Sequence, residues 1–251
     1  MKPTSRDDVT PQAVRYDESY FRSYNYEGAS LGRFSMYWWA RRYYATLVKR
    51  RRHSGRLLEI GCGLGHLLAR LENRFETFGI DISEYAVAQA RRVARRSTVE
   101  VLPAEGIDRF GPDAFDVIVA LHLMEHLHDP ALVLRKCAQV SRRGGLLLMT
   151  TPNLRAPFIR LKGEEWQGYK DKTHINMKEP HVWRQLLEAS GFRVEKVFGD
   201  GLWNVPYVTF IPARIQLAFF GLPAAVQTLT GTTFNPARLG ENLIILAEKS
   251  G

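Results

Sequence analysis

A turn rich in glycine is the part of this chain best suited to hold a ligand. Gly61, Gly63 and Gly65 follow an apolar stretch over 57–60 and precede a second apolar stretch over 67–71. The spacing predicts a buried strand, a tight turn and the start of a helix. Glycine accepts positive φ and has no β-carbon, so a ligand can approach the backbone closely. A helix that begins here would also direct free N–H groups at that ligand.

An acid at the end of the next expected strand adds a second ligand contact. The apolar stretch 77–80 ends in Asp81, 16 residues after Gly65. A carboxylate in this place can accept hydrogen bonds from the hydroxyls of a ribose. The glycine turn and Asp81 together predict a site for a nucleoside-containing cofactor on a doubly wound α/β sheet.

The spacing of the glycines distinguishes among such cofactors. The dinucleotide pattern G-x-G-x-x-G would need its third glycine at 66, where this chain has His66. The chain instead has E-x-G-x-G-x-G, from Glu59 to Gly65. An acid beside the turn would repel a pyrophosphate, whereas it would attract the ammonium group of a methionine tail.

This pattern resembles motif I of the class I S-adenosylmethionine (SAM) methyltransferases. The resemblance implies SAM as the cofactor and a set of residues that contact it: Glu59, Gly61, Cys62, Gly63, Gly65, Asp81, Ile82, Ala104, Glu105 and Leu121. In the family, the turn after the third strand meets the adenine edge, often with an acid directly before the alanine. Pro103 stands in that place here, which leaves Ala104 N–H and Glu105 as the candidates.

Later segments extend the resemblance. The segment 115–127 looks like the FDvvv…EHl segment of the family that contains the quinone-biosynthesis O-methyltransferases. Asp129 and Pro130 then have the residue types of a helix N-cap and first turn. Gly144 and Gly145 are expected to end that helix.

The resemblance implies an α/β fold, a doubly wound, Rossmann-like sheet of seven strands with an N-terminal helical cap and a helical insertion before the last strand. The last strand is expected to be antiparallel. Beyond the first two strands, we expect strands over 99–102, 115–120, 146–149, 192–197 and 242–247. We divide the chain into an N-terminal arm and aromatic cap over 1–54, a SAM-binding core over 55–200, an apolar insertion over 201–240 and the last strand over 241–251.

Three histidines are candidates for proton transfer. An oxygen nucleophile usually loses a proton during methylation, and histidine titrates near neutral pH. His122 follows the fourth expected strand, His126 comes one helical turn later, and His174 lies in a long connection. We expect His126 or His174 to be the general base and His122 to line the methyl site. The alternative for His126 is a structural hydrogen bond to nearby backbone.

Neither a metal site nor a disulfide is expected. The acids and histidines within 125–129 are too close in sequence for a typical zinc site. Two cysteines, Cys62 and Cys137, indicate no disulfide framework. No long apolar run follows the first residues, so we expect no secretory leader and a cytoplasmic protein.

The chain is strongly basic, with a formal net charge of +9 and a pI of about 9.7. Arginine and lysine cluster at 41–42, 49–52, 91–92 and 95–96. Such clusters attract nucleic acid, anionic lipid or acidic substrates, and the alternative is a set of solvated helix faces. No RNP or KH motif is visible, so a nucleic-acid partner is not expected.

Aromatic residues recur at helical spacing over 34–48. One interpretation is an amphipathic helix that caps the sheet edge. The other is a lid over the SAM pocket, in which case Tyr20, Tyr24 or Arg33 would contact the cofactor or the acceptor. Residues 1–14 are polar and contain two prolines, so they are expected to form a loose arm.

The segment 201–240 is apolar but is not expected to cross a membrane. Arg214 interrupts it, and four residues are expected to break any helix, namely Pro206, Pro212, Gly221 and Pro223. It is interpreted as a cover over an apolar acceptor pocket, as a peripheral contact with a membrane surface, or as packing against the sheet. A homodimer contact would use the same apolar surface.

The resemblance implies methyl transfer from SAM, a displacement in which positioning supplies much of the catalysis. We expect O-methylation of a small, fairly apolar, hydroxylated acceptor. One alternative is an RNA (tRNA) methyltransferase, suggested by the arginine clusters. The other is a SAM-binding, methyltransferase-like protein without catalysis.

Overall fold

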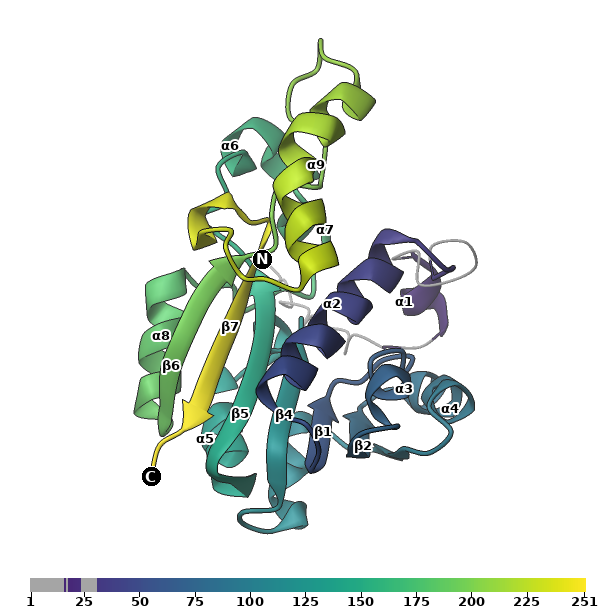
Figure 1. Cartoon of the computed structure of the whole chain (residues 1–251), viewed down its shortest axis with the longest axis vertical. Coiled ribbons are helices and arrows are strands. Elements are labelled where there is room, and N and C mark those ends of the chain that lie inside the picture. Colours follow the sequence, from purple (N-terminus) through teal and green to yellow (C-terminus); the bar gives the residue numbers. More distant parts are fainter. Residues whose placement is uncertain (1–15, 17, 24–30) are drawn as a thin grey trace, which may run out of the picture.

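The computed structural model describes Tyr16, residues 18–23 and residues 31–251. In this part of the chain seven strands form one sheet, in the order β3-β2-β1-β4-β5-β7-β6 (Figure 1). The strands are β1 (Arg56–Ile60), β2 (Glu76–Asp81), β3 (Thr98–Val101), β4 (Phe115–Leu121), β5 (Ser141–Pro152), β6 (Phe192–Gly199) and β7 (Asn242–Lys249). β7 runs antiparallel to both neighbours, so the predicted fold is confirmed. The expected arm over 1–14, and Tyr24, lie outside the described residues.

The parallel register brings the candidate site residues to one edge of the sheet. β1 pairs in parallel with β2 on one side and with β4 on the other, and Ile60 is level with Ile80 and Ala120. Gly61, Asp81 and Leu121 therefore lie side by side at the carboxyl edge. Open α/β sheets bind their ligands at this edge.

Helices cover both faces of the sheet (Figure 1). α2 (Met36–Arg51), α3 (Leu68–Leu71) and α4 (Glu84–Val93) pack on one face, and η2 (Ala104–Phe110), α5 (Pro130–Val140) and α8 (Pro180–Ala189) pack on the other. β4 contributes alternate residues to the two layers, Val117 and Val119 to the first and Ile118 and Ala120 to the second. The other helices are α1 (Glu18–Ser23), η3 (Met124–His126), α6 (Ile159–Lys162), η4 (Gly163–Glu165), α7 (Gln167–Lys170), α9 (Ala213–Thr230) and η5 (Ala237–Leu239).

The aromatic helix expected over 34–48 is α2. Ser35 caps it, because its hydroxyl accepts a hydrogen bond from Trp38 N at 3.1 Å. Tyr43 and Leu47 are buried and belong to the same hydrophobic cluster as residues of β1 and β4. α2 therefore caps the sheet, and other residues of the same helix line the cavity described below. The division of the chain into four segments stays a prediction.

The helix expected after Asp129 forms, but it ends earlier than expected. The Asp129 carboxylate accepts a hydrogen bond from Leu132 N at 2.9 Å, as an N-cap does. We expected Gly144 and Gly145 to end this helix, which is wrong, because α5 ends at Val140. The two glycines lie within β5, where its pairing with β4 shifts register and Gly144 has a φ of 71°. They form a bulge in the strand.

The insertion over 201–240 contains one long helix, α9. We expected Gly221 and Pro223 to break any helix here, which is wrong, because α9 continues through both. Close packing holds the turn after the proline in place, since a β-carbon on Gly201 would lie only 2.4 Å from Cβ of Ala224. Among the described residues, no helix is both long and apolar enough to cross a membrane.

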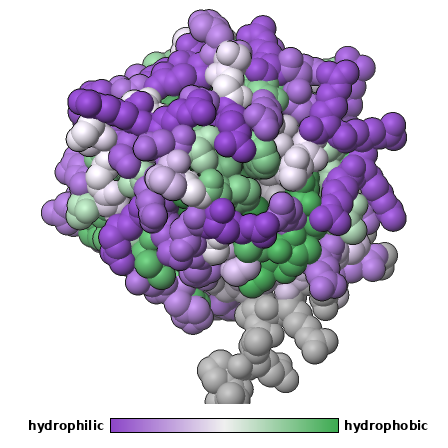
Figure 2. Space-filling view, turned by 90° about the horizontal axis from the view of Figure 1, so that it is seen from below, coloured by the Kyte–Doolittle hydropathy of each residue, from purple (hydrophilic) through white to green (hydrophobic). Residues whose placement is uncertain are grey.

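The molecule has a largely hydrophilic surface when it is seen from below, with smaller apolar patches between polar side chains (Figure 2). Inside, Cys62 and Cys137 are both buried as free thiols. Burial raises the pKa of the Cys137 thiol to about 12, which keeps it protonated.

Candidate functional site

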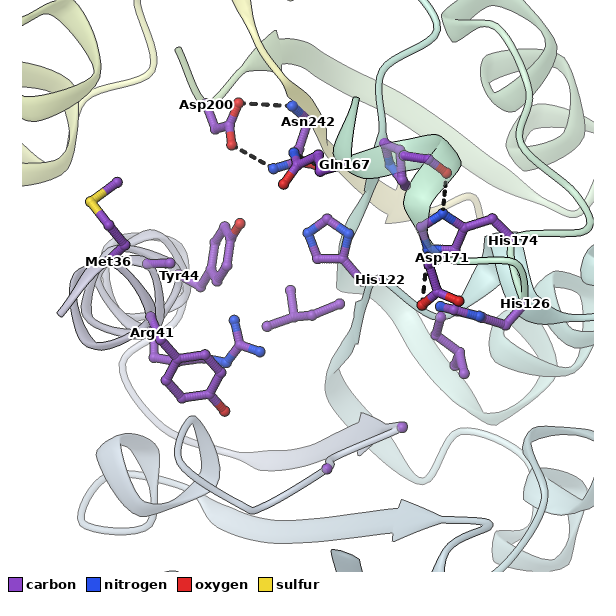
Figure 3. A pocket seen from close by; sticks show the side chains of 18 of the residues that line it. Met36, Arg41, Tyr44, His122, His126, Gln167, Asp171, His174, Asp200 and Asn242 are labelled. Carbon is purple, nitrogen blue, oxygen red and sulfur yellow. Dashed lines mark hydrogen bonds and ion pairs between the residues drawn. The ribbon is translucent and has the colours of Figure 1, made fainter. Parts of the chain in front are cut away.

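A cavity of about 1830 Å³ opens at the carboxyl edge of the sheet. Its walls come from the glycine turn, the ends of β2 and β4, residues 167–175, α2 and α9. Side chains from these elements point toward one another across the open space (Figure 3). The cofactor residues expected from the sequence all line this cavity except Gly65, and the three candidate histidines line it too.

The three glycines of the turn have different roles. All have positive φ: 68° at Gly61, 50° at Gly63 and 76° at Gly65. A β-carbon on Gly63 would meet no described atom within 4 Å, so this glycine leaves the space in front of the turn open. A β-carbon on Gly65 would lie 2.8 Å from Cα of Ala90, so Gly65 lets the turn pack on α4. The helix expected after the turn is reduced to the single turn of α3.

Asp81 is bound to the backbone on both sides. Its Oδ2 accepts a hydrogen bond from Gly63 N at 2.9 Å, and its Oδ1 accepts one from Ser83 N at 2.9 Å. Burial raises the pKa of Asp81, and these backbone hydrogen bonds oppose the rise. Each carboxylate oxygen has two lone pairs, so both retain a position for a ribose hydroxyl.

Glu59 is the buried acid beside the glycine turn. Its side chain is 2% exposed, and its Oε2 has no hydrogen-bond partner among the described residues. Burial raises the pKa of Glu59 to about 8, against the opposing charge of Arg41. Burying a carboxylate oxygen without a partner is unfavourable. An ammonium group would satisfy that oxygen, so this part of the site fits the methionine tail of SAM.

Arg41 is a cavity residue that we did not predict from the sequence. It lies on α2, with its guanidinium 4.2 Å from the ring centre of Tyr37, and it points into the cavity (Figure 3). Its charge acts on Glu59, so the two groups lie close together. A cation and an acid side by side suit the carboxylate and the ammonium of one amino acid. Two features of the sequence indicated it, the basic cluster at 41–42 and the position of Arg41 one turn after Tyr37 in an aromatic helix.

The residues expected at the adenine edge, Ala104 and Glu105, line one side of the cavity together with Ile82. Ile82 is exposed and apolar, while Ala104 begins η2 directly after Pro103. Glu105 lines the same side, and its backbone carbonyl accepts a hydrogen bond from Lys136. An apolar surface beside a polar edge suits a planar heterocycle.

His122 and Glu125 form a pair at the end of β4. His122 has a φ of 50°, which is uncommon for a residue with a β-carbon. Residues in such backbone conformations occur mostly at functional sites. Its Nδ1 lies 3.3 Å from Oε1 of Glu125, which is fully buried. Burial acts to raise the pKa of Glu125, but the His122 hydrogen bond and the neighbouring histidines outweigh it, so the pKa lies below its ordinary value. The His122 ring points into the cavity (Figure 3).

His126 is tied to the loop after α7. The Thr173 hydroxyl donates to Oδ1 of Asp171 at 2.6 Å and lies 2.8 Å from Nδ1 of His126. A hydroxyl has one proton, so Nδ1 of His126 donates to Thr173 and Nε2 is left without a proton. Burial lowers the pKa of His126, in agreement with a neutral ring. The alternative expected for this residue was a hydrogen bond to nearby backbone, whereas Nδ1 of His126 is bonded to the side chain of Thr173, 47 residues away.

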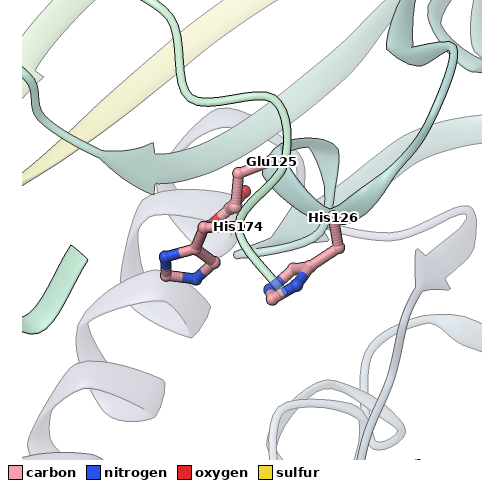
Figure 4. Close-up of side chains that lie close together, drawn as sticks. All are labelled: Glu125, His126 and His174. Atoms are coloured by element: carbon pink, nitrogen blue, oxygen red, sulfur yellow. The ribbon is translucent and has the colours of Figure 1, made fainter. Parts of the chain in front are cut away.

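His174 lies next to His126 in space, with ring centres 4.7 Å apart. Its Nδ1 is 2.7 Å from the carbonyl oxygen of Gly168, so that nitrogen is the donor. Glu125, His126 and His174 together offer three ligand atoms within 4.8 Å of one another, a set that could hold a metal ion (Figure 4). The group weighed from the sequence was different, because it included His128, which is exposed.

A polar wall at the far side of the cavity was not predicted either. The Asp200 carboxylate accepts hydrogen bonds from Asn242 N at 2.8 Å, Asn242 Nδ2 at 2.7 Å and Trp203 Nε1 at 2.6 Å. Gln167 Nε2 donates to Oδ1 of Asn242 at 3.3 Å. Burial raises the pKa of Asp200 to about 6. All four residues line the cavity.

Comparison with known protein sequences agrees with this geometry. A family model described as a methyltransferase domain matches residues 37–197. The chain is 33% identical over 105 residues to a ubiquinone biosynthesis O-methyltransferase of Neisseria meningitidis, which is 39% of this chain. It is 31% identical over 158 residues, 57% of this chain, to a protein of the same name from Pseudomonas putida. The chain spans 44% of the length of the first relative and 67% of the second.

Solved structures share the fold. The plantazolicin methyltransferase BamL, in complex with a triazolic desmethyl analogue and S-adenosylhomocysteine (SAH), superposes with a TM-score of 0.60 at 17% identity. The superposition covers 92% of this chain and 90% of BamL. The family match spans most of the chain, and the cofactor residues are assembled in one cavity. The chain therefore belongs to the SAM-dependent methyltransferases.

Proposed function

We propose that this methyltransferase methylates a hydroxyl oxygen of a small, largely apolar acceptor. The main observation is the position of His122, which projects into the cavity from the end of β4 and contacts the buried carboxylate of Glu125. A histidine held by a buried acid is a suitable base for a hydroxyl group.

The cofactor supplies an activated methyl group on a sulfonium, so the protein mainly has to position the reactants. We assign Glu59 to the ammonium of the methionine tail and Arg41 to its carboxylate. Asp81 holds the ribose hydroxyls, and Ile82 and Ala104 flank the adenine. Each of these residues lines the cavity.

We assign the general base to His122, in preference to His126 or His174. With Nδ1 donating to Glu125, the lone pair on Nε2 of His122 is available to the acceptor. As the acceptor oxygen forms its bond to the methyl carbon and the carbon–sulfur bond breaks, His122 Nε2 takes the hydroxyl proton. The buried charge of Glu125 stabilises the imidazolium that results. His126 and His174 are joined to the loop over 168–173, which they hold in place.

The acceptor site lies between the glycine turn and α9. Its apolar side comes from α2 and α9, with residues such as Tyr44 and Leu222, and its polar side from Asp200, Gln167 and Asn242. Relatives named as ubiquinone biosynthesis O-methyltransferases support an oxygen acceptor. The arginine pairs at 91–92 and 95–96 do not line the cavity, which favours a small molecule over RNA.

The test is methylation of a panel of small acceptors with matched hydroxyl and amine groups, followed by SAH release and mass spectrometry of the products. We expect catechols and phenols with apolar substituents to be methylated on oxygen. Asp200→Asn is expected to raise KM for the acceptor and to leave SAH binding unchanged. Methylation of the amines alone, or of RNA alone, would show that the proposal is wrong.

A further inference from the structure

α9 buries polar and small side chains and exposes large apolar ones. Its buried residues are polar or small: Gln216, Gly221, Ala224 and Gln227. Its exposed residues include most of its large apolar side chains: Ile215, Leu217, Phe219, Leu222, Val226 and Leu229. A helix on the surface of a globular protein has the opposite arrangement, with apolar residues inward.

Hydrogen bonds of the two buried glutamines fix this orientation. Gln216 Oε1 accepts from the backbone N–H groups of Tyr207 at 2.7 Å and Val208 at 3.0 Å, and its Nε2 donates to the carbonyls of Val208 and Ile211, both at 2.6 Å. Rotation of α9 that buried its apolar face would break these bonds and leave buried backbone groups without partners.

Gln227 holds the other end of the helix in the same way. Its Nε2 donates to the carbonyl of Gly199 at 2.9 Å, and its Oε1 accepts from Asn235 N at 2.9 Å. Gln216 therefore attaches α9 to the loop before it, and Gln227 attaches it to the end of β6, through side chains that face inward. The apolar side is left facing outward in the folded chain.

Residues on both sides of the helix enlarge the apolar surface. Phe210, before α9, is 84% exposed, and Phe219 within it is 77% exposed. Phe234, after the helix, is exposed as well. Large apolar side chains that are exposed together on one segment of a soluble protein mark a contact with a partner or a membrane.

The charges of this segment indicate an anionic partner. Residues 201–240 contain no aspartate or glutamate, and Arg214 is the only charged residue of α9. Two neighbouring cations bind its backbone, Lys162 at the carbonyl of Asn204 and Arg50 at the carbonyl of Gly231. The acids on either side of the segment, Asp200 and Glu241, are held in hydrogen bonds inside the protein.

We propose that the apolar face of α9, with Phe210, docks on the surface of a lipid bilayer that contains anionic lipids. The helix would lie in the plane of the interface, with its apolar side chains among the acyl chains and Arg214 at the headgroups. A second copy of the chain would instead place one acid-free, basic segment against another. Anionic headgroups complement that charge, which is why we choose the bilayer.

The proposed contact lies at the mouth of the cavity. Leu217, Leu222 and Leu229 are exposed and also line the cavity, so one continuous apolar surface extends from the outside of α9 to the inside. An apolar compound dissolved in the bilayer could enter without crossing water. The docking itself does not depend on the acceptor that we propose.

The experiment is flotation of the full chain with vesicles, without any acceptor. One set contains phosphatidylcholine with phosphatidylglycerol, and the other contains phosphatidylcholine alone. We expect the wild type to float with the anionic vesicles. Phe210→Ser with Phe219→Ser is expected to weaken binding roughly tenfold or more, because two exposed aromatic side chains are lost. Arg214→Gln is expected to weaken binding to the anionic vesicles alone, by about fivefold.

Two controls make the result specific. Val93→Ser removes an exposed apolar side chain from α4 and is expected to bind like the wild type. SAH binding is measured for every variant, because it reports a folded site without requiring an acceptor. Absence of vesicle binding by the wild type, or wild-type binding by the double variant, would overturn the proposal. A dimer in sedimentation that the double variant abolishes, without vesicle binding, would assign the face to a second copy and overturn it too.

Discussion

Nδ1 of His122 lies 3.3 Å from Oε1 of Glu125, and the Glu125 side chain is completely buried. The two residues are three apart in the chain, and η3 brings them together directly after β4. A carboxylate with no access to water orients the imidazole in one direction. The positive φ of His122 completes that orientation, because it turns the side chain away from the path of the strand.

Replacement of His122 by Asn is expected to lower kcat by roughly 10²–10⁴-fold, the usual contribution of a general base. The dissociation constant for SAH is expected to stay unchanged, because the base does not hold the cofactor. Glu125→Gln keeps the shape of the side chain but loses the charge, so a smaller loss of kcat is expected. Single-turnover kinetics and calorimetry separate the two effects.

The matched control is His53→Asn, which changes an exposed histidine that does not line the cavity and is expected to have wild-type kinetics. A large loss of kcat in His126→Asn or His174→Asn, with little loss in His122→Asn, would contradict the assignment of His122. The general base would then be His126 or His174.

Binding of SAH is expected to release a proton below pH 8. Burial raises the pKa of Glu59 from 4.5 to about 8, so the folded protein without ligand keeps a proton that the unfolded chain loses. The contribution of Glu59 to folding stability therefore falls as the pH rises from 4.5 to about 8. A bound ammonium favours the ionised carboxylate. Affinity for SAH is thus expected to rise with pH, by at most about tenfold per unit, and to level off near pH 8.

Calorimetric titration with SAH at several pH values, in buffers with different heats of ionisation, measures that proton directly. Glu59→Gln is expected to bind SAH more weakly and without this pH dependence. An affinity of the wild type that stays constant between pH 6 and 8 would contradict the assigned role of Glu59.

The glycines of the turn are expected to respond differently to alanine. Gly65→Ala forces a β-carbon against the backbone of Ala90 at positive φ, and is expected to lower the free energy of unfolding by about 2–5 kcal/mol. Gly63→Ala adds a β-carbon in open space, so only the backbone term of about 1–2 kcal/mol applies. Its main effect is expected on SAH affinity. Denaturant unfolding and SAH titration of both variants check the contrast, and equal losses of stability would refute it.

Zinc ions are expected to inhibit turnover, although we propose that catalysis itself needs no metal. Glu125, His126 and His174 offer ligand atoms close together, and an ion bound there would withdraw Glu125 from His122. Treatment of the wild type with a chelator is expected to leave turnover intact, and His174→Ala is expected to reduce the zinc inhibition. Loss of turnover on chelation, restored by a divalent ion, would instead identify a metal cofactor.

Much of the sheet and of the cofactor site could be predicted from the sequence, because short-range patterns encode both. β4, β5 and β7 contain continuous apolar runs over 117–121, 146–149 and 243–247, and the glycine turn is followed by Asp81 at the end of the next strand. The cap of α5 at Asp129 is equally local. Such features depend on neighbours within a few residues, or on the single parallel crossover between β1 and β2.

The features that could not be predicted from the sequence depend on contacts between distant segments of the chain. Asp200 and Gln167 meet only because β7 enters between β5 and β6 and brings Asn242 to both. The extent of α9 was mispredicted because its residues indicate helix breaks, whereas buried Gln216 and Gln227 bind it to other segments. The predicted helix end at Gly144 is wrong because a glycine in a strand bulge cannot be told from a helix-ending glycine by sequence alone.

The hydrogen bond from Gly63 N to Asp81 Oδ2 couples two parts of the cofactor site. The shape of the turn and the position of the Asp81 carboxylate, which we assign to the ribose, depend on each other, because this hydrogen bond is present without any ligand. An affinity change in Asp81→Ala is therefore expected to contain both the loss of the ribose contact that we propose and a loosened turn. The turn is therefore ordered when the protein folds. Binding of the cofactor does not have to provide the free energy that orders it.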